Sequence, residues 1–148
     1  GPAEPENRTG QTVMSEILEQ ERHEQGYARS EADVLRVIER AVLDSDYHAN
    51  GYTTRAQADR LGDLLELAPG HLLLDVGSGC GWPGLYLAAR TGCSVVTVDP
   101  VMAGVRTAHR RIGDDTMSER AWAVAGTADQ VPLRQGSVDA IVHTDVMC

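Results

Sequence analysis

LLLDVGSGCG, residues 72–81, is the stretch of this 148-residue chain that decides its fold. An apolar run of strand length ends at Asp75, and glycines follow at alternate positions, Gly77, Gly79 and Gly81. Glycine adopts backbone angles that other residues avoid, and it allows a close approach between the backbone and a ligand. A helical pattern comes next, so the loop lies at a helix N-terminus, where open α/β sheets bind nucleotide-type cofactors.

The order of strand, loop and helix continues toward the C-terminus. Strands are predicted at residues 71–76, 94–98, 121–125 and 138–143, with helices at 83–90 and 102–112. Apolar strands that alternate with helices indicate a parallel sheet with right-handed crossovers. The second half of the chain therefore predicts an α/β fold.

Helices are predicted before this sheet. Residues 12–25 and 31–44 carry apolar residues at helical spacing, and a third helix runs from Thr54 through Leu65. Ser30 is expected to cap the second helix, and Thr54 caps the third with Gln57 in capping-box position. The second helix has an apolar stripe that consists of Val34, Leu35, Val37, Ile38, Ala41 and Val42. Residues 1–10 are expected to be disordered, and Gly1-Pro2 is typical of a cleaved purification tag.

Composition argues against several functions. The net charge is −9 and lysine is absent, which disfavours a nucleic-acid partner because phosphate binding needs clustered Lys and Arg. We find no signal peptide and no long apolar run, so we expect a cytoplasmic protein without membrane insertion. Cys80, Cys93 and Cys148 have neither zinc spacing nor an even number for disulfides, and we expect no metal site.

Two kinds of cofactor fit the glycine loop. Asp99 lies 20 residues after Gly79 and could accept hydrogen bonds from a ribose in either case. Residues 79–84, GCGWPG, match the dinucleotide pattern G-x-G-x-x-G, although its first glycine should directly follow the strand. Asp75 would be poorly placed beside an anionic pyrophosphate and well placed beside an ammonium and a sulfonium group. Charge therefore favours S-adenosyl-L-methionine over NAD.

Motifs in the same order resemble those of the class I S-adenosylmethionine-dependent methyltransferases. The matching stretches are the glycine motif DVGSGCG (75–81), the ribose motif VTVDP (96–100), the adenine loop GTADQVPL (126–133) and the fourth strand GSVDAIV (136–142). The similarity covers about residues 52–148 and is closest to the subgroup that methylates small molecules. It implies a Rossmann-like sheet and methyl transfer from S-adenosyl-L-methionine to a small-molecule acceptor.

The resemblance also implies roles for single residues. Asp75 would anchor the cofactor's amino group, directly or through water, and Asp99 would hold the ribose. The methionine part would lie over the glycine loop, which consists of Gly77, Ser78, Gly79 and Gly81. For both acids the alternative is capping of the strand ends.

The adenine would be held by two further segments. Pro100 and Val101 would pack against it, and it could be read by Thr127, by the Ala128 backbone N–H or by Asp129. The family usually has an acid where this chain has Thr127, and Asp129 could also be a solvated loop residue.

The sequence leaves the roles of one tryptophan and two histidines undecided. Trp82 could cover the site or only pack in the core. His143, at the end of the fourth strand, could contact the methionine group or the acceptor, or only pack there. His48 is a candidate general base, although a loop histidine is more often solvated.

The family's sheet has the strand order 3-2-1-4-5-7-6, and this sequence stops after the fourth strand. We therefore expect a truncated Rossmann-like domain at residues 52–148, preceded by a tail and helices at 1–51 that form a lid or an oligomer contact. An exposed fourth strand favours pairing with another chain, so we expect a homo-oligomer through this edge or through the N-terminal helices. The alternatives are a non-catalytic S-adenosylmethionine-binding or dimerising module and a NAD-binding domain.

Overall fold

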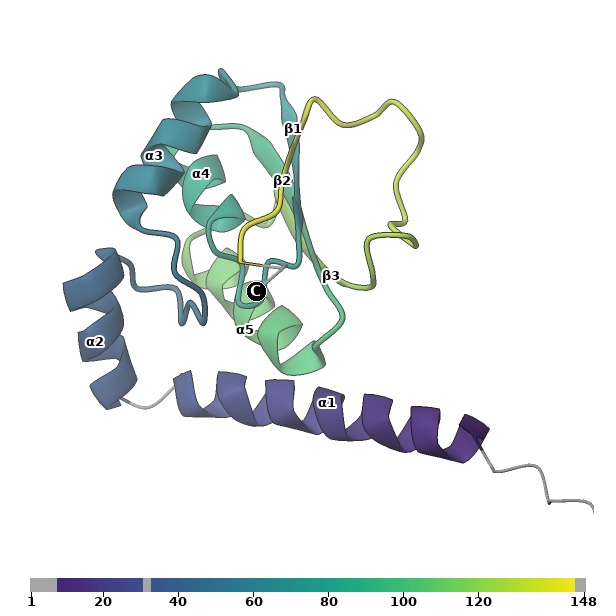
Figure 1. Cartoon of the computed structure of the whole chain (residues 1–148). Coiled ribbons are helices and arrows are strands. Elements are labelled where there is room, and N and C mark those ends of the chain that lie inside the picture. Colours follow the sequence, from purple (N-terminus) through teal and green to yellow (C-terminus); the bar gives the residue numbers. More distant parts are fainter. Residues whose placement is uncertain (1–7, 31–32, 146–148) are drawn as a thin grey trace, which may run out of the picture.

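The computed structural model describes residues 8–30 and 33–145, with side chains placed for 12–26 and 33–145. A four-stranded parallel sheet has the order β3-β2-β1-β4. The elements are α1 (Arg8–Ser30), α2 (Asp33–Leu43), α3 (Arg55–Leu64), β1 (Leu72–Val76), α4 (Gly84–Thr91), β2 (Ser94–Asp99), α5 (Met102–Asp114), β3 (Ala121–Ala125) and β4 (Ala140–Val142). The predicted α/β fold and the order of its first four strands are confirmed (Figure 1).

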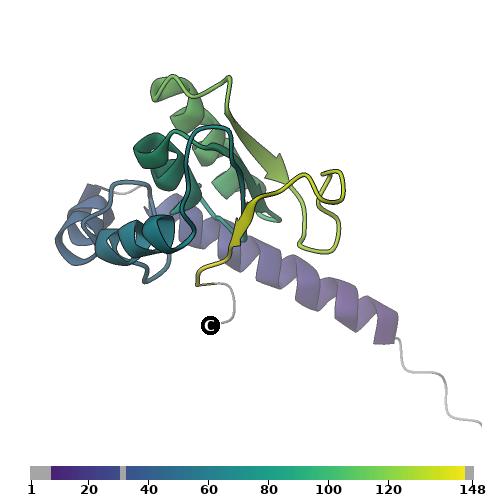
Figure 2. The same cartoon turned by 90° about the horizontal axis from the view of Figure 1, so that it is seen from above.

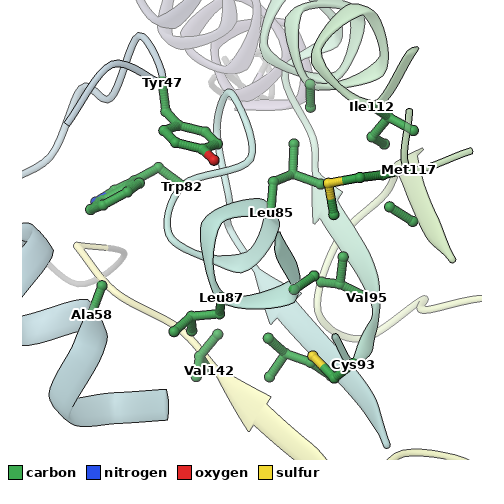
Figure 3. Packing of buried hydrophobic residues seen from close by; sticks show 14 of the residues in the cluster. Tyr47, Ala58, Trp82, Leu85, Leu87, Cys93, Val95, Ile112, Met117 and Val142 are labelled. Atoms are coloured by element: carbon green, nitrogen blue, oxygen red, sulfur yellow. The ribbon is translucent and has the colours of Figure 1, made fainter. Parts of the chain in front are cut away.

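One face of the sheet carries the main core. Helices α3, α4 and α5 cover this face (Figure 1), and the fully buried side chains beneath them include Leu73, Leu85, Leu87 and Val95. Figure 3 shows Leu85, Leu87 and Val95 among the side chains of this core. The chain has no phenylalanine, and this core consists mainly of aliphatic side chains, with Cys93 and Met117 and the two aromatic residues Tyr47 and Trp82.

The other face of the sheet is covered by a loop. Leu74, Val96 and Val98 are buried there, and side chains of the segment 126–139 pack over them, among them Val131 and Leu133. This segment forms the long excursion between β3 and β4 on the side opposite the helices (Figure 1). Both faces of β1 and β2 are therefore apolar, as expected for a parallel sheet.

The predicted boundaries hold well for the central elements. The capping box at the start of α3 is present, since Gln57 N donates to Thr54 Oγ1 and Thr54 N donates to Gln57 Oε1. Strand β4 is shorter than the predicted 138–143. Asp139 N and Oδ2 still bond the backbone of Leu72, but a turn closed by Ser137 N and Arg134 O precedes it and ends the ladder.

Helix α1 is longer than predicted. It extends beyond residues 12–25 at both ends and includes residues 8–10, which the sequence analysis assigned to a disordered tail. Glutamate and glutamine, which are strong helix formers, recur between Glu16 and Gln25 and support the extension. Gly1-Pro2, Cys148 and the capping side chain of Ser30 lie outside what the structure describes.

Helix α2 turns its apolar stripe outward. Val34, Val37 and Val42 are each more than 60% exposed, whereas Glu39 on the same helix is only 6% exposed. The stripe therefore does not pack within the described chain. The cause is local, because the loop after α2 holds the opposite, polar face.

That polar face of α2 is tied down by hydrogen bonds. Glu39 Oε1 accepts from Ser45 Oγ at 2.7 Å and from Tyr47 N at 2.8 Å. Arg36 and Arg40 both pair with Asp46, at 2.8 and 2.6 Å. The position of α2 therefore depends on polar contacts with residues 45–47.

Candidate functional site

The glycine loop between β1 and α4 has a backbone that requires glycine. Gly77, Gly79 and Gly81 have φ angles of 69°, 55° and 97°. These angles lie in the left-handed region, which side chains with a Cβ avoid. Gly77 N and Ser78 N both donate to Val98 O, at 2.8 and 3.2 Å, and fix the loop to the end of β2.

Asp75 lies buried beneath this loop. Its Oδ2 accepts a hydrogen bond from Gly84 N at 2.7 Å, at the first residue of α4. Its Oδ1 is buried and has no partner among the described residues. Burial raises the pKa of Asp75 well above the ordinary value, opposed by the Gly84 bond and assisted by the negative charge of Asp99.

Asp99 holds the loop from the other side. Its Oδ2 accepts from Gly79 N and its Oδ1 from Val101 N, both at 2.8 Å. The side chain thus caps the start of α5 and orients the middle of the glycine loop. Asp75 and Asp99 therefore both accept hydrogen bonds from backbone N–H groups at the ends of their strands, which is the capping role given above as the alternative to cofactor binding. Asp99 also lines a cavity.

A cavity of about 660 Å³ opens above the carboxyl ends of the strands. This volume lies within the range of small-molecule and cofactor sites. Its walls are formed by residues 77–80 and Trp82, by 99–101, by Thr127, by 49–51, by 144–145 and by one face of α1. Ligands bind at this position in open α/β sheets.

The sequence analysis named none of the residues of α1 that line the cavity. Glu16, Glu19, Gln20 and His23 line the cavity. Gln20 Nε2 donates to Pro100 O at 3.5 Å, which joins α1 to the segment after β2. Helix α1 lies along the carboxyl-end edge of the sheet beside α5, and its N-terminal end projects beyond the domain (Figures 1 and 2).

Comparison with known families gives one match that covers half of the chain. A family described as "Methyltransferase domain" matches residues 73–148. The chain belongs to this family. The resemblance drawn from the four motifs is therefore confirmed, and residues 73–148 are part of a methyltransferase domain.

Similar proteins support this assignment. The chain is 36% identical over 97 residues to 24-methylenesterol C-methyltransferase 2 of rice, Oryza sativa subsp. japonica, covering 64% of this chain and 26% of the rice protein. Geranyl diphosphate C-methyltransferase from Streptomyces coelicolor A3(2), solved with Mg2+, geranyl diphosphate and S-adenosyl-L-homocysteine, is 27% identical with a TM-score of 0.56, covering 60% of this chain and 33% of that one. The chain thus spans only about a quarter to a third of the length of these relatives.

A third protein supports the fold alone. A S-adenosylmethionine-dependent methyltransferase from Thiobacillus denitrificans, solved with S-adenosyl-L-homocysteine, has a TM-score of 0.56 at 22% identity and covers 76% of this chain and 43% of that one. This coverage extends beyond the matched family segment into the residues before β1.

In this methyltransferase domain, one of the three residues proposed to bind an adenine lies at the cavity. Thr127 lines it, whereas Ala128 and Asp129 are exposed and do not. The Thr127 hydroxyl donates to the Asp129 carboxylate, and this bond lowers the pKa of Asp129. Asp129 therefore orients Thr127 in this structure. Pro100 and Val101 also line the cavity.

Trp82 both packs in the core and lines the cavity. Its ring lies 5.2 Å from that of Tyr47 and 5.2 Å from that of Tyr86, and Figure 3 shows Tyr47 and Trp82 side by side. Its Nε1 donates to Thr53 O at 2.9 Å. Trp82 thus connects the glycine loop to the segment before α3.

Thr53 also connects this segment to the end of β4. Asp145 Oδ2 accepts from Thr53 N at 3.1 Å and from Thr53 Oγ1 at 2.8 Å. Thr144 and Asp145 line the cavity, whereas their neighbour His143 is exposed and does not. Sequence reasoning selected His143 from the three residues after β4, whereas the two residues that follow it reach the cavity.

Other predicted features are placed outside the cavity. His48 is partly buried and does not line it, although Ala49, Asn50 and Gly51 do. Among residues 8–30 and 33–145, no group of His, Cys, Asp and Glu is arranged to hold a metal ion. No helix in the same residues combines the length and apolarity needed to cross a bilayer.

Proposed function

We propose that this chain carries the cofactor-binding half of an S-adenosylmethionine-dependent methyltransferase that acts on a small-molecule acceptor. The observation that carries the proposal is the meeting of Gly77 and Gly79, both at positive φ, with Asp99 at one edge of the cavity. Gly81 and the buried Asp75 support this loop from below and do not line the cavity. The sterol methyltransferase from rice and the geranyl diphosphate methyltransferase from Streptomyces, by their names, act on small molecules.

The charges around the cavity suit this cofactor better than a dinucleotide. The acids that line the cavity are Asp99, Asp145, Glu16 and Glu19, and no Arg or Lys lines it among the described residues. A pyrophosphate would find no cationic partner there, whereas an ammonium or sulfonium group would be attracted. The buried Oδ1 of Asp75 lacks a partner, and the cofactor's amino group would supply one directly or through water.

The roles of the residues follow from their positions. When bound, S-adenosylmethionine supplies an activated methyl group, so the protein mainly has to bind and orient. Asp99 would hold the ribose while its bonds to Gly79 and Val101 keep it in place. Thr127 would read the adenine, and Pro100 and Val101 would pack against it. Residues 1–51 would form a lid over the domain at 52–148, with α1 and Trp82 limiting access of water.

We also infer a location and an assembly. Cys80 and Cys93 are both buried and neither forms a disulfide, which suits the reducing cytoplasm. The exposed apolar stripe of α2 and the short β4 at the sheet edge are surfaces through which two copies could associate.

The test is calorimetric titration of the chain with S-adenosylhomocysteine, with NAD as the control. Micromolar binding of S-adenosylhomocysteine alone is the expected result. Binding of NAD that S-adenosylhomocysteine does not displace would overturn the proposal in favour of a dinucleotide site. Absence of binding to both ligands would contradict the claim that this part of the domain forms the cofactor site.

A further inference from the structure

The side chain of Asp75 carries a polar atom without a partner in the described chain. The residue is 1% exposed, and its Oδ2 accepts one hydrogen bond, from Gly84 N at 2.7 Å. Its Oδ1 is buried as well and has no hydrogen-bond partner among the described residues. Buried polar atoms are nearly always paired in folded proteins, so this orphaned oxygen beneath the glycine loop needs an explanation.

The elements packed around this carboxyl offer it no positive charge. In the sheet, Asp75 lies level with Thr97 of β2 and with Val142 of β4, which belongs to the main core. On the helix side it contacts Gly84, the first residue of α4. Among the described residues, the charged group that acts on Asp75 is Asp99 at the end of β2, and the two acids repel each other when both are ionised.

A carboxyl in these surroundings keeps its proton. Desolvation strongly disfavours a buried carboxylate that has one hydrogen bond and no cation, and it disfavours the neutral acid much less. Because Oδ2 accepts from Gly84 N, the proton resides on Oδ1. The same burial raises the pKa of Asp75 well above its ordinary value, opposed by the bond from Gly84 N and assisted by the charge of Asp99.

The position of Asp75 relative to the cavity allows a bound charge to act on it. The backbone of residues 77–79 lines the cavity, and Asp75 lies beneath this loop without lining the cavity itself. A positive charge held against the loop would therefore act across a single layer of backbone, in a region without water to screen it. A cation within about 4–6 Å favours the ionised form of a carboxyl.

We propose that Asp75 is protonated in the free chain and releases its proton when a ligand that carries an ammonium group binds above the glycine loop. This inference rests on the proposed function and deepens it, because it makes cofactor binding depend on pH. On release, the O–H bond of Asp75 breaks and the proton passes to bulk water. The carboxylate then accepts an N–H of the ammonium group, or an O–H of a water molecule between them.

Other titratable side chains line the cavity itself. They are Glu16, Glu19 and His23 on α1, Asp99 after β2 and Asp145 after β4. Histidine is the side-chain type among these that ordinarily titrates near neutral pH. His23 is therefore the competing source of a released proton, and the experiment has to separate it from Asp75.

The experiment is calorimetric titration of the chain with S-adenosylhomocysteine in buffers of different ionisation enthalpy, at several pH values between about 6 and 8. The slope of the observed enthalpy against the ionisation enthalpy of the buffer gives the number of protons released. The matched ligand is 5′-methylthioadenosine, which keeps the adenosine and the sulfur but lacks the ammonium group. The matched variants are Asp75→Asn, whose amide has the shape of the protonated acid and cannot ionise, and His23→Gln.

We expect S-adenosylhomocysteine to release about one proton per site, and its affinity to rise with pH by up to about tenfold per pH unit. Binding of 5′-methylthioadenosine should release none. Asp75→Asn should abolish both the release and the pH dependence of the affinity, whereas His23→Gln should retain both.

Binding of S-adenosylhomocysteine to the wild type without proton release would overturn the inference. Equal release by Asp75→Asn, or equal release on binding of 5′-methylthioadenosine, would overturn it as well. The comparison of the two ligands needs only the wild-type chain, so it decides the question even where a variant does not fold. If S-adenosylhomocysteine itself does not bind, the proposed function fails instead, so the two failures are distinguishable.

Discussion

The carboxylate of Asp75 and the backbone of Gly84 are in direct contact at the centre of the domain. Gly84 N donates to Asp75 Oδ2 at 2.7 Å, and a Cβ on residue 84 would lie 2.6 Å from the same oxygen. The acid at the end of β1 therefore fixes the start of α4, and only glycine leaves room for it. This contact forms the base of the glycine loop.

Replacement of Gly84 by alanine is expected to destabilise the domain by about 3 kcal/mol, because the new methyl group has to displace a fully buried carboxylate. Urea unfolding measures the loss. Gly113→Ala is the matched control, since Gly113 lies in α5 with nothing within 4 Å of a new Cβ. There the change should be neutral or stabilising by up to about 1 kcal/mol. Equal effects of the two substitutions would contradict the contact described above.

The buried carboxyl of Asp75 also predicts a pH dependence. Because burial raises its pKa in the folded state, the folded chain keeps a proton that the unfolded chain releases above about pH 4. Stability should then fall as the pH rises toward the raised pKa, with a slope of up to about 1.4 kcal/mol per pH unit.

Asp75→Asn removes this titration while its amide oxygen can still accept from Gly84 N. The measurement is the difference in unfolding free energy between the wild type and the variant, at several pH values between about 4 and 8. Relative to the variant, the wild type should lose stability as the pH rises. A difference that stays constant with pH would mean that Asp75 has an ordinary pKa.

The sequence predicted the centre of the domain well because its signals there are local. The Leu and Val runs of β1 and β2 are buried on both faces, so their composition alone identifies parallel strands. The Thr54–Gln57 capping box is likewise a short-range pattern that the structure reproduces. The glycine loop was recognised from glycines at alternate positions after a strand, and their positive φ angles explain why other residues are excluded there.

What the sequence did not predict depends on side-chain contacts that no simple sequence pattern encodes. The apolar stripe of α2 would normally face a core, but hydrogen bonds from residues 45–47 to Glu39 turn it outward. The polar face of α1 has the pattern of a solvated helix surface, and only its docking at Pro100 makes it a cavity wall. Thr53 and Asp145, which pair across 92 residues, carry no signal that either would find the other.

Asp99 is expected to be needed for cofactor binding. Asp99→Asn replaces an acceptor of a backbone N–H by a donor, so either Gly79 N or Val101 N loses its partner. We expect affinity for S-adenosylhomocysteine to fall at least about tenfold, and stability to fall by about 1–3 kcal/mol. Calorimetry and urea unfolding measure the two effects. Asp114→Asn, on an exposed residue outside the cavity, should change the affinity by less than about twofold. The prediction fails if the two variants bind equally well.

The hydrogen bonds between Thr53 and Asp145 are expected to hold the segment before α3 over the cavity. Thr53→Val removes the bond from Oγ1 and keeps the shape of the side chain, at a cost of about 1 kcal/mol. Amide hydrogen exchange should become faster at residues 50–53 and remain unchanged in the sheet. Thr91→Val removes a hydroxyl that bonds to Leu87 O and Cys93 N at the end of α4, away from this segment, and it should leave exchange at 50–53 unaltered. Equal exchange in all three proteins would argue against this role.

The exposed stripe of α2 is expected to mediate self-association. Val34, Val37 and Val42 are each more than 60% exposed, and such clusters on soluble proteins commonly mark protein contacts. By contrast β4, the alternative surface, offers an edge of only three residues.

Light scattering should therefore find a dimer or larger species, and Val37→Lys/Val42→Lys should convert it to a monomer. Ile141→Lys places a charge on β4, where such residues block edge pairing, and it should leave the assembly intact. A monomeric wild type would exclude self-association, and dissociation by Ile141→Lys alone would assign it to the sheet edge.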